Sequence, residues 1–154
     1  MGTALAKRLV QSRFESPVQV AILNLLVAAS YLQEQNERLL AEHNLSPAQY
    51  NVLRILKGVH PEGHPRCEIA RRMIERAPDL TRMIDGLERR GLVERARSDH
   101  DRRHSITRIT RRGLDLIQRT APATAAIHGL LARRLTRGEL AELSRLCEKL
   151  YASA

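Results

Sequence analysis

Aromatic residues, lysine and cysteine are all scarce in this chain of 154 residues. It has three tyrosines, one phenylalanine and no tryptophan, so its hydrophobic core must be built mainly from aliphatic side chains. Its two cysteines, Cys67 and Cys147, are far apart in the sequence and show no CxxC spacing. This excludes a disulfide scaffold and indicates a reduced, intracellular protein. The hydrophobic content of 43% argues against a disordered chain, and the length fits one compact domain.

We also expect no membrane-spanning or targeting segment in this sequence. Residues 18–30 are strongly apolar, but this stretch is too short to cross a bilayer, and Gln19 and Asn24 interrupt it. We therefore expect a cytoplasmic protein without a membrane partner. The sequence patterns of common enzyme sites, GxSxG, HExxH and the glycine-rich phosphate loop, are missing as well. We expect no enzymatic activity, no catalytic residue, no cofactor and no bound metal.

Positive charge, in contrast, is abundant, and it is carried by arginine. The formal net charge is +9, and of the 26 basic residues only Lys7, Lys57 and Lys149 are lysines. Between residues 66 and 112 there are 14 arginines and 8 acidic residues, so most of the excess charge lies in about one third of the chain. Such clustering is the electrostatic signature of a polyanionic partner, and it predicts binding to nucleic acid.

The hydrophobic periodicity predicts a mainly α-helical fold with one two-stranded ribbon. Several helix starts carry capping signals: Ser16 precedes Pro17, and Ser46 with Gln49 and Thr136 with Glu139 form capping boxes. Gly91 is expected to end a helix. We expect helices over 17–42, 47–57, 67–76, 78–90, 111–134 with a break near Pro122, and 137–150, strands over 92–98 and 104–110, and a loop over 59–65.

The helices at 67–76 and 78–90, joined by only a residue or two, predict a helix-turn-helix, and the ribbon after them makes it winged. The second helix has a buried apolar stripe, and its opposite face is slender and polar, which fits the major groove of DNA. Arg102 and Arg103 at the ribbon tip can enter a minor groove, a role that suits guanidinium better than ammonium. The stripe is Leu80, Met83, Ile84 and Leu87, and the polar face is Asp79, Thr81, Arg82, Asp85, Gly86 and Arg89.

Three stretches, LSPAQYNVLRIL, DLTRMIDGLERRGLVER and DHDRRHSITRITRRG, resemble the winged helix-turn-helix of the multiple-antibiotic-resistance regulator (MarR) family. The resemblance covers almost the whole chain and is most specific over 80–113. It implies a homodimer, formed by the N- and C-terminal helices, that binds a pseudo-palindromic operator in double-stranded DNA. It also implies repression that is relieved by a small aromatic or phenolic effector. By the family pattern Thr81 and Arg82 lie on the recognition helix, Asp101 braces the wing and Arg103 enters the minor groove.

We therefore expect a mainly α, winged helix-turn-helix fold with a two-stranded wing and flanking N- and C-terminal dimerisation helices. Residues 1–45 would form the first dimerisation segment, 46–112 the DNA-binding lobe and 113–154 the second dimerisation segment. The assigned DNA contacts are Pro78, Asp79, Thr81, Arg82, Asp85, Arg102 and Arg103, with Asp101 and Arg95 bracing the wing. The assigned dimer interface is Val18, Ile22, Leu25, Leu140, Leu143 and Leu146, and the assigned ligand pocket is Tyr31, Leu32 and Tyr50.

Two residues depart from the family pattern. Asp79 is an acid where a small residue is usual, and phosphates would repel it unless it reads a base or pairs with an arginine. Gly86 stands where a basic residue is common, and it weakens the helix by roughly 1 kcal/mol relative to alanine. Both departures affect the choice of target sequence and leave the fold unchanged.

Other functions remain open at this point. The first is a winged-helix architectural protein that binds DNA without sequence preference, and the second is a winged-helix module that binds protein. The third is a metal-responsive regulator, suggested by His60 and His64 in one loop and by Glu42 and His43. The fourth is a redox-responsive regulator that uses Cys67, which lies near a helix start where the pKa of a thiol can be lowered.

Overall fold

The structure is a computed structural model that describes residues 3–11, 13–97 and 105–152. Its helices are α1 (Thr3–Leu9), α2 (Pro17–Ala41), α3 (Pro47–Lys57), α4 (Arg66–Arg72), α5 (Leu80–Arg89), α6 (Arg111–Arg119), α7 (Ala121–Ala132) and α8 (Arg137–Tyr151). Its strands are β1 (His64–Pro65), β2 (Val93–Arg97) and β3 (Ser105–Ile109). The predicted mainly α-helical, winged helix-turn-helix fold is confirmed.

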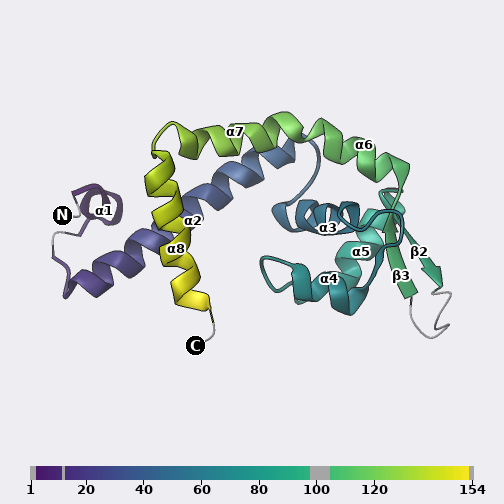
Figure 1. Cartoon of the computed structure of the whole chain (residues 1–154), viewed down its shortest axis with the longest axis horizontal. Helices are drawn as coiled ribbons and strands as arrows, with labels where there is room; N and C mark the ends of the chain where they lie inside the picture. Colours follow the sequence, from purple (N-terminus) through teal and green to yellow (C-terminus); the bar gives the residue numbers. More distant parts are fainter. Residues whose placement is uncertain (1–2, 12, 98–104, 153–154) are drawn as a thin grey trace.

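Figure 1 shows an open helical part and a compact lobe. The open part contains α2, α7 and α8, with α1 beside α2, and the lobe contains α3, α4, α5 and the strands. Helices α6 and α7 run end to end along the top of both parts, so they connect the two.

The hydrophobic core lies in the lobe and is almost entirely aliphatic, as the scarcity of aromatic residues predicts. Tyr50 is only partly buried and packs against the edge of this core. Burial of these side chains is the main force that holds the helix-turn-helix together, because it removes apolar surface from water. The buried residues are Leu40, Leu45, Val52, Leu53, Leu56, Ile69, Leu80, Ile84, Leu87, Leu92, Val93, Ile109, Leu116 and Ile117.

Helix α2 is the longest helix of the described chain, with 25 residues, and Leu40 is its one buried residue. Leu40 lies near the end of the helix where α2 meets the lobe, and the earlier turns carry partly exposed side chains. Among the described helices, none combines the length and the apolar character that crossing a bilayer requires.

The helix starts that carry capping signals form where the sequence predicts them. Ser46 and Gln49 make a reciprocal capping box at α3, and Thr136 and Glu139 make one at α8. Ser16 caps α2, where its side chain accepts from the backbone N–H of Gln19. These bonds satisfy backbone donors that have no partner inside the helix, and they fix the first residue of each helix.

The connection between α4 and α5 differs from the prediction. Helix α4 ends at Arg72 rather than at residue 76, and seven residues, 73–79, separate it from α5. The cause is Met73, whose backbone is extended (φ −68°, ψ 141°) and whose side chain packs against the core. Anchoring of Met73 takes the chain out of the helix. The expectation of a one- or two-residue turn was therefore wrong.

The sheet has one strand more than predicted. The expected ribbon forms from β2 and β3, and β1 adds to the other edge of β3, giving the antiparallel order β1-β3-β2. Strand β1 lies within residues 59–65, where we expected only a loop. It is two residues long and contains Pro65, so neither periodicity nor propensity could indicate it.

The break between α6 and α7 lies at Thr120, two residues before Pro122. The buried Thr120 hydroxyl donates to the carbonyl oxygen of Ile117 over 2.7 Å, which satisfies an acceptor at the end of α6. Proline lacks a backbone N–H, so it is accepted in the first turn of α7 but not inside a continuous helix. The predicted break is confirmed.

Candidate nucleic-acid interface

Helix α5 has the two faces that the sequence predicts. Leu80, Ile84 and Leu87 are buried in the core, and Met83 packs against them. Thr81 and Arg82 point away from this stripe and are exposed near the start of the helix. The N-terminal residues of a recognition helix are the ones that reach base edges, and the residues predicted to contact DNA lie at this end of α5.

Asp79 caps α5. Its carboxylate accepts from the backbone N–H of Arg82 over 3.3 Å, and its second oxygen lies 3.9 Å from the guanidinium of the same residue. Both side chains are largely exposed, so the ion pair is weak and the cap is the stronger contribution. Asp79, the acid that departs from the family pattern, thus pairs with Arg82. Pro78 lies just before it and is exposed.

Arg95 of β2 bridges the wing and α5. Its guanidinium contacts Asp85 and donates to Glu88 over 2.9 Å, and its backbone N–H donates to the other Glu88 oxygen over 3.0 Å. Asp85, which we assigned to a DNA contact, thus pairs with Arg95 of the wing strand instead. Glu88 was missed by sequence reasoning. The three-residue spacing of Asp85 and Glu88 was the available signal, since it places both carboxylates on one face.

The basic residues of α4 are partly neutralised within their own helix. Glu68 accepts from Arg71 over 2.9 Å and also pairs with Arg72. The hydrogen bond from Arg72, and next the one from Arg71, lower the pKa of the Glu68 carboxyl, which remains charged. This cluster faces solvent and was not among the predicted site residues.

The tip of the wing lies outside the described residues. Asp101, Arg102 and Arg103 belong to it, and their assigned roles remain predictions. The base of the wing is described, and Arg108 of β3 donates to the backbone oxygen of Glu62 over 3.0 Å. This bond joins the inner strand of the wing to the turn before β1.

The residues assigned to a dimer interface lie on the open helical part. Val18 and Ile22 of α2 are 67% and 54% exposed, Leu25 is also exposed, and so are Leu143 and Leu146 of α8. Leu140 is half-buried. Helix α8 has no buried residue at all, although it carries leucine at regular spacing. Two amphipathic helices therefore present apolar side chains to solvent in the single chain.

Two of the three residues assigned to a ligand pocket, Tyr50 and Tyr31, make contacts with α7 and the turn after it. Tyr50 shares a hydrogen bond of 3.0 Å with Thr124, and the Arg134 guanidinium lies 5.5 Å from the centre of the Tyr31 ring. Leu32 is half-buried.

Two hollows, of about 740 and 340 Å³, open at other places on the surface. Neither hollow is lined by these three residues. The larger is lined by Arg111, Arg112, Asp115, Gln118 and Arg119, and the smaller by Leu39, Glu42, His43, Arg119, Pro122 and Ala123.

The histidines and cysteines are dispersed. Within the described ranges, no three His, Cys, Asp or Glu side chains gather closely enough to hold a metal ion.

His64 is half-buried, and its Nε2 atom is buried without a hydrogen-bond partner among the described residues. Burial, and next the charge of Arg72, lower the pKa of His64. Cys67 is exposed and Cys147 is half-buried.

Comparison with known proteins agrees with this architecture. The sequence profile of the MarR family matches residues 45–105. The MarR transcription factor from Planctomyces limnophilus is 39% identical in sequence, covers 88% of this chain over 98% of its own length, and superposes with a TM-score of 0.68. The chain belongs to the MarR family.

Other similar proteins are more distant. The HTH-type transcriptional regulator MhqR of Bacillus subtilis (strain 168) is 31% identical over 85 residues, which are 55% of this chain and 57% of MhqR. The chain thus spans just over half the length of this curated relative. Two solved MarR-like structures share the fold at lower identity. S. aureus MepR, in a DNA complex, has a TM-score of 0.75 at 18% identity, covering 84% of this chain and 95% of MepR. CouR from Rhodococcus jostii RHA1, bound to p-coumaroyl-CoA, has a TM-score of 0.77 at 19% identity, covering 92% of this chain and 99% of CouR.

Proposed function

We propose that this MarR-family protein is a transcriptional repressor that binds double-stranded DNA in a sequence-specific manner. The observation that carries the proposal is the exposed N-terminal face of α5, with Thr81 and Arg82, in the arginine-rich segment of a winged helix-turn-helix. Arg82 can bond guanine through two N–H groups, and Thr81 can contact a thymine methyl group or a phosphate. Arg102 and Arg103 of the wing tip contact the minor groove.

The acting form is a homodimer. Exposed leucine, isoleucine and valine side chains on α2 and α8 support this assembly, because a two-fold interface between these helices would remove them from water. A symmetric dimer places its two recognition helices about 34 Å apart, in successive major grooves. The operator is accordingly a pseudo-palindrome whose half-sites repeat with the helical turn of DNA.

A small apolar or aromatic effector releases the DNA. Its site lies where α2, α3 and α7 meet, near Tyr31, Leu32 and Tyr50. The structure of CouR bound to p-coumaroyl-CoA supports this part of the proposal, since the same fold there accommodates an organic ligand. The hydrogen bond between Tyr50 and Thr124 joins the lobe to α7, so a ligand that displaces it alters the orientation of the lobe.

The test is fluorescence anisotropy of the purified protein on DNA from upstream of its own gene and on scrambled DNA, across a salt series. We expect a preference of about a thousandfold or more for the upstream DNA at physiological salt. Equal affinity for both, falling steeply with salt, would show that the arginines only neutralise phosphates. The protein would then be an architectural DNA-binding protein.

A further inference from the structure

One hydrogen bond ties the segment between the two helices of the helix-turn-helix to α3. The side-chain oxygen of Asn51, in the middle of α3, accepts from the backbone N–H of Ile74 over 2.9 Å. Ile74 is the second residue of the segment 73–79 that replaces the short turn expected there. The bond joins residues that are 23 positions apart in the chain.

Apart from Met73 and Ala77, which pack against the core, the rest of this segment has few contacts to hold it. At its start, the Met73 N–H closes α4 on the carbonyl of Ala70 over 3.4 Å, and at its end Asp79 caps α5. Within the described chain, the backbone N–H groups of 75–77 make no hydrogen bond. A segment with so few bonds samples many paths unless an anchor restricts it. Between the two ends, Asn51 supplies a hydrogen-bonded anchor in addition to the apolar packing of Ala77.

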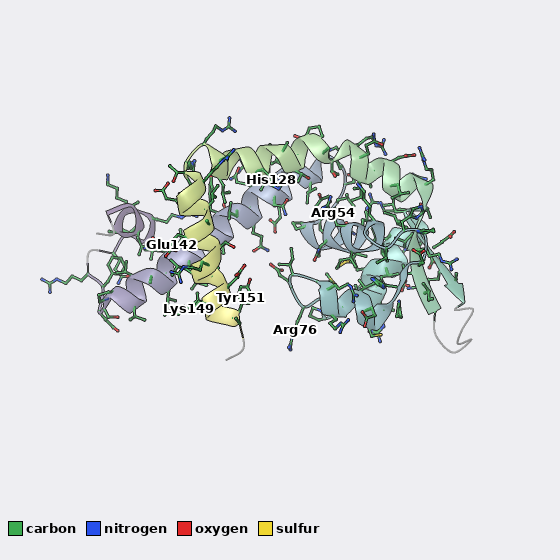
Figure 2. The ribbon with its side chains drawn as sticks, in the orientation of Figure 1. Arg54, Arg76, His128, Glu142, Lys149 and Tyr151 are labelled. Atoms are coloured by element: carbon green, nitrogen blue, oxygen red, sulfur yellow. The ribbon has the colours of Figure 1, made fainter. Side chains whose placement is uncertain are left out.

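The path of the segment matters because the segment leads into the recognition helix. It runs through Pro78 and Asp79 directly into the exposed end of α5 that carries Thr81 and Arg82. The segment itself exposes Ile74, at 88%, and Arg76. Figure 2 shows Arg76 at the lower edge of the lobe, pointing away from the ribbon. A change in the path would therefore move the whole reading end of the helix-turn-helix.

We propose that Asn51 is a positioning residue for DNA recognition. Its amide oxygen holds Ile74 and thereby sets where α5 begins relative to α3. Asparagine suits the task because it offers a short, uncharged acceptor, whereas a carboxylate at the same place would repel DNA phosphates. The inference rests on the proposed DNA-binding function, and it assigns Asn51 a role through the backbone rather than through contact with a base.

The test compares the full chain with three variants, Asn51→Ala, Asn51→Asp and Gln118→Ala. Asn51→Ala removes the acceptor, and Asn51→Asp keeps an oxygen at the same place. Gln118→Ala is the matched control, because it removes an exposed amide from α6, which packs against α3. Two quantities are measured: hydrogen exchange of the Ile74 amide by NMR, and affinity for upstream and scrambled DNA. Thermal unfolding confirms that each variant is folded at the assay temperature.

We expect Asn51→Ala to speed exchange of the Ile74 amide and to weaken binding to upstream DNA by about three- to tenfold, the loss of one ordinary hydrogen bond. Binding to scrambled DNA should stay unchanged, as should both quantities in Gln118→Ala. Asn51→Asp should keep the slow exchange of Ile74. Unchanged exchange in Asn51→Ala would overturn the proposal.

Equal losses on both DNAs would also overturn it, because loosening of the lobe as a whole would then explain them. Weaker DNA binding in Asn51→Ala with Ile74 exchange still slow would show that Asn51 contacts DNA directly, which contradicts the positioning role. A wild-type protein without preference for the upstream DNA would instead defeat the proposed function, and the exchange data would still test the bond itself.

Discussion

Arg95 and Glu88 form a two-point contact, in which the guanidinium and the backbone N–H of Arg95 each donate to one oxygen of the Glu88 carboxylate. The two residues lie on different elements, β2 and α5, and the second carboxylate of the cluster, Asp85, also comes from α5. Strand β2 of the wing and helix α5 are therefore coupled by side chains as well as by the short connection at Gly91.

Replacement of Arg95 by alanine should weaken both the fold and DNA binding. The change leaves Asp85 and Glu88 without their cation on the proposed DNA-binding surface. We expect a loss of about 1 kcal/mol in the free energy of unfolding, the value for a partly exposed charged hydrogen bond. Urea unfolding and anisotropy would measure the two effects. Arg111→Ala, which breaks the exposed pair with Asp115, is the matched control. In a double-mutant cycle, strictly additive losses of unfolding free energy for Arg95→Ala and Glu88→Gln would contradict the coupling.

Removal of the wing arginine tests the minor-groove contact. Arg103→Ala should weaken operator binding by about 1–3 kcal/mol if the guanidinium is desolvated in the groove. Arg54→Ala, which removes an exposed arginine of α3 (Figure 2), should have a much smaller effect at the same salt concentration. Equal effects of the two substitutions in a binding titration would mean that Arg103 contributes only its charge.

A carboxylate on the apolar face of α8 should separate the dimer. Leu143→Glu affects both copies of a two-fold interface, so the free energy of dimerisation should fall by at least about 3 kcal/mol. Sedimentation velocity would detect a folded monomer, and operator affinity should fall with it. Lys149→Glu places the same group on the charged face of the helix and should leave the dimer intact. A stable Leu143→Glu dimer would discard this interface.

Acid should destabilise the lobe through His64. Burial, then Arg72 and Arg71, lower the pKa of His64, while Glu68 opposes the shift. The unfolded chain therefore binds a proton at His64 more readily than the folded chain does. Consequently, the contribution of neutral His64 to the free energy of unfolding is fully present above the ordinary pKa of 6.5. It is lost as the pH falls below that value.

Thermal unfolding of the wild type between pH 7 and pH 5 would measure this loss. The variant His64→Gln should show a shallower dependence on pH, because it cannot take up the proton. His128→Gln, at an exposed histidine of α7 (Figure 2), should behave as the wild type does. An unchanged slope in His64→Gln would assign the acid sensitivity to other groups.

The parts of the fold that the sequence predicted are those governed by local chemistry. Ser46 with Gln49 and Thr136 with Glu139 formed their capping boxes because each pair satisfies its own backbone groups. The stripe from Leu80 to Leu87 was buried because its spacing matches one face of a helix. Such features depend on a few neighbouring residues, and therefore a single sequence contains them in full.

The missed features depend on distant partners. Strand β1 exists because β3 offers His64 and Pro65 a free edge, and α4 ends early because Met73 packs into a core made elsewhere. The contacts of Arg95 and of Asn51 join different elements, and their geometry depends on the packing between those elements. Among the assigned site residues, Asp85 illustrates the same limit, because only the folded chain brings Arg95 against it.

The joint at Thr120 has a mechanical consequence. Helix α6 is fastened to the lobe through Leu116 and Ile117, whereas α7 lies along α2 in the open helical part. Thr120 keeps helical hydrogen bonds on both sides, from its own N–H to Leu116 and from the Thr124 N–H to its carbonyl oxygen, so the orientation of α6 is passed on to α7. In the proposed dimer, a change in the angle between α6 and α7 would therefore change the distance between the two ends of α5 that carry Arg82. The joint contains none of the residues assigned to DNA contact or to the dimer interface.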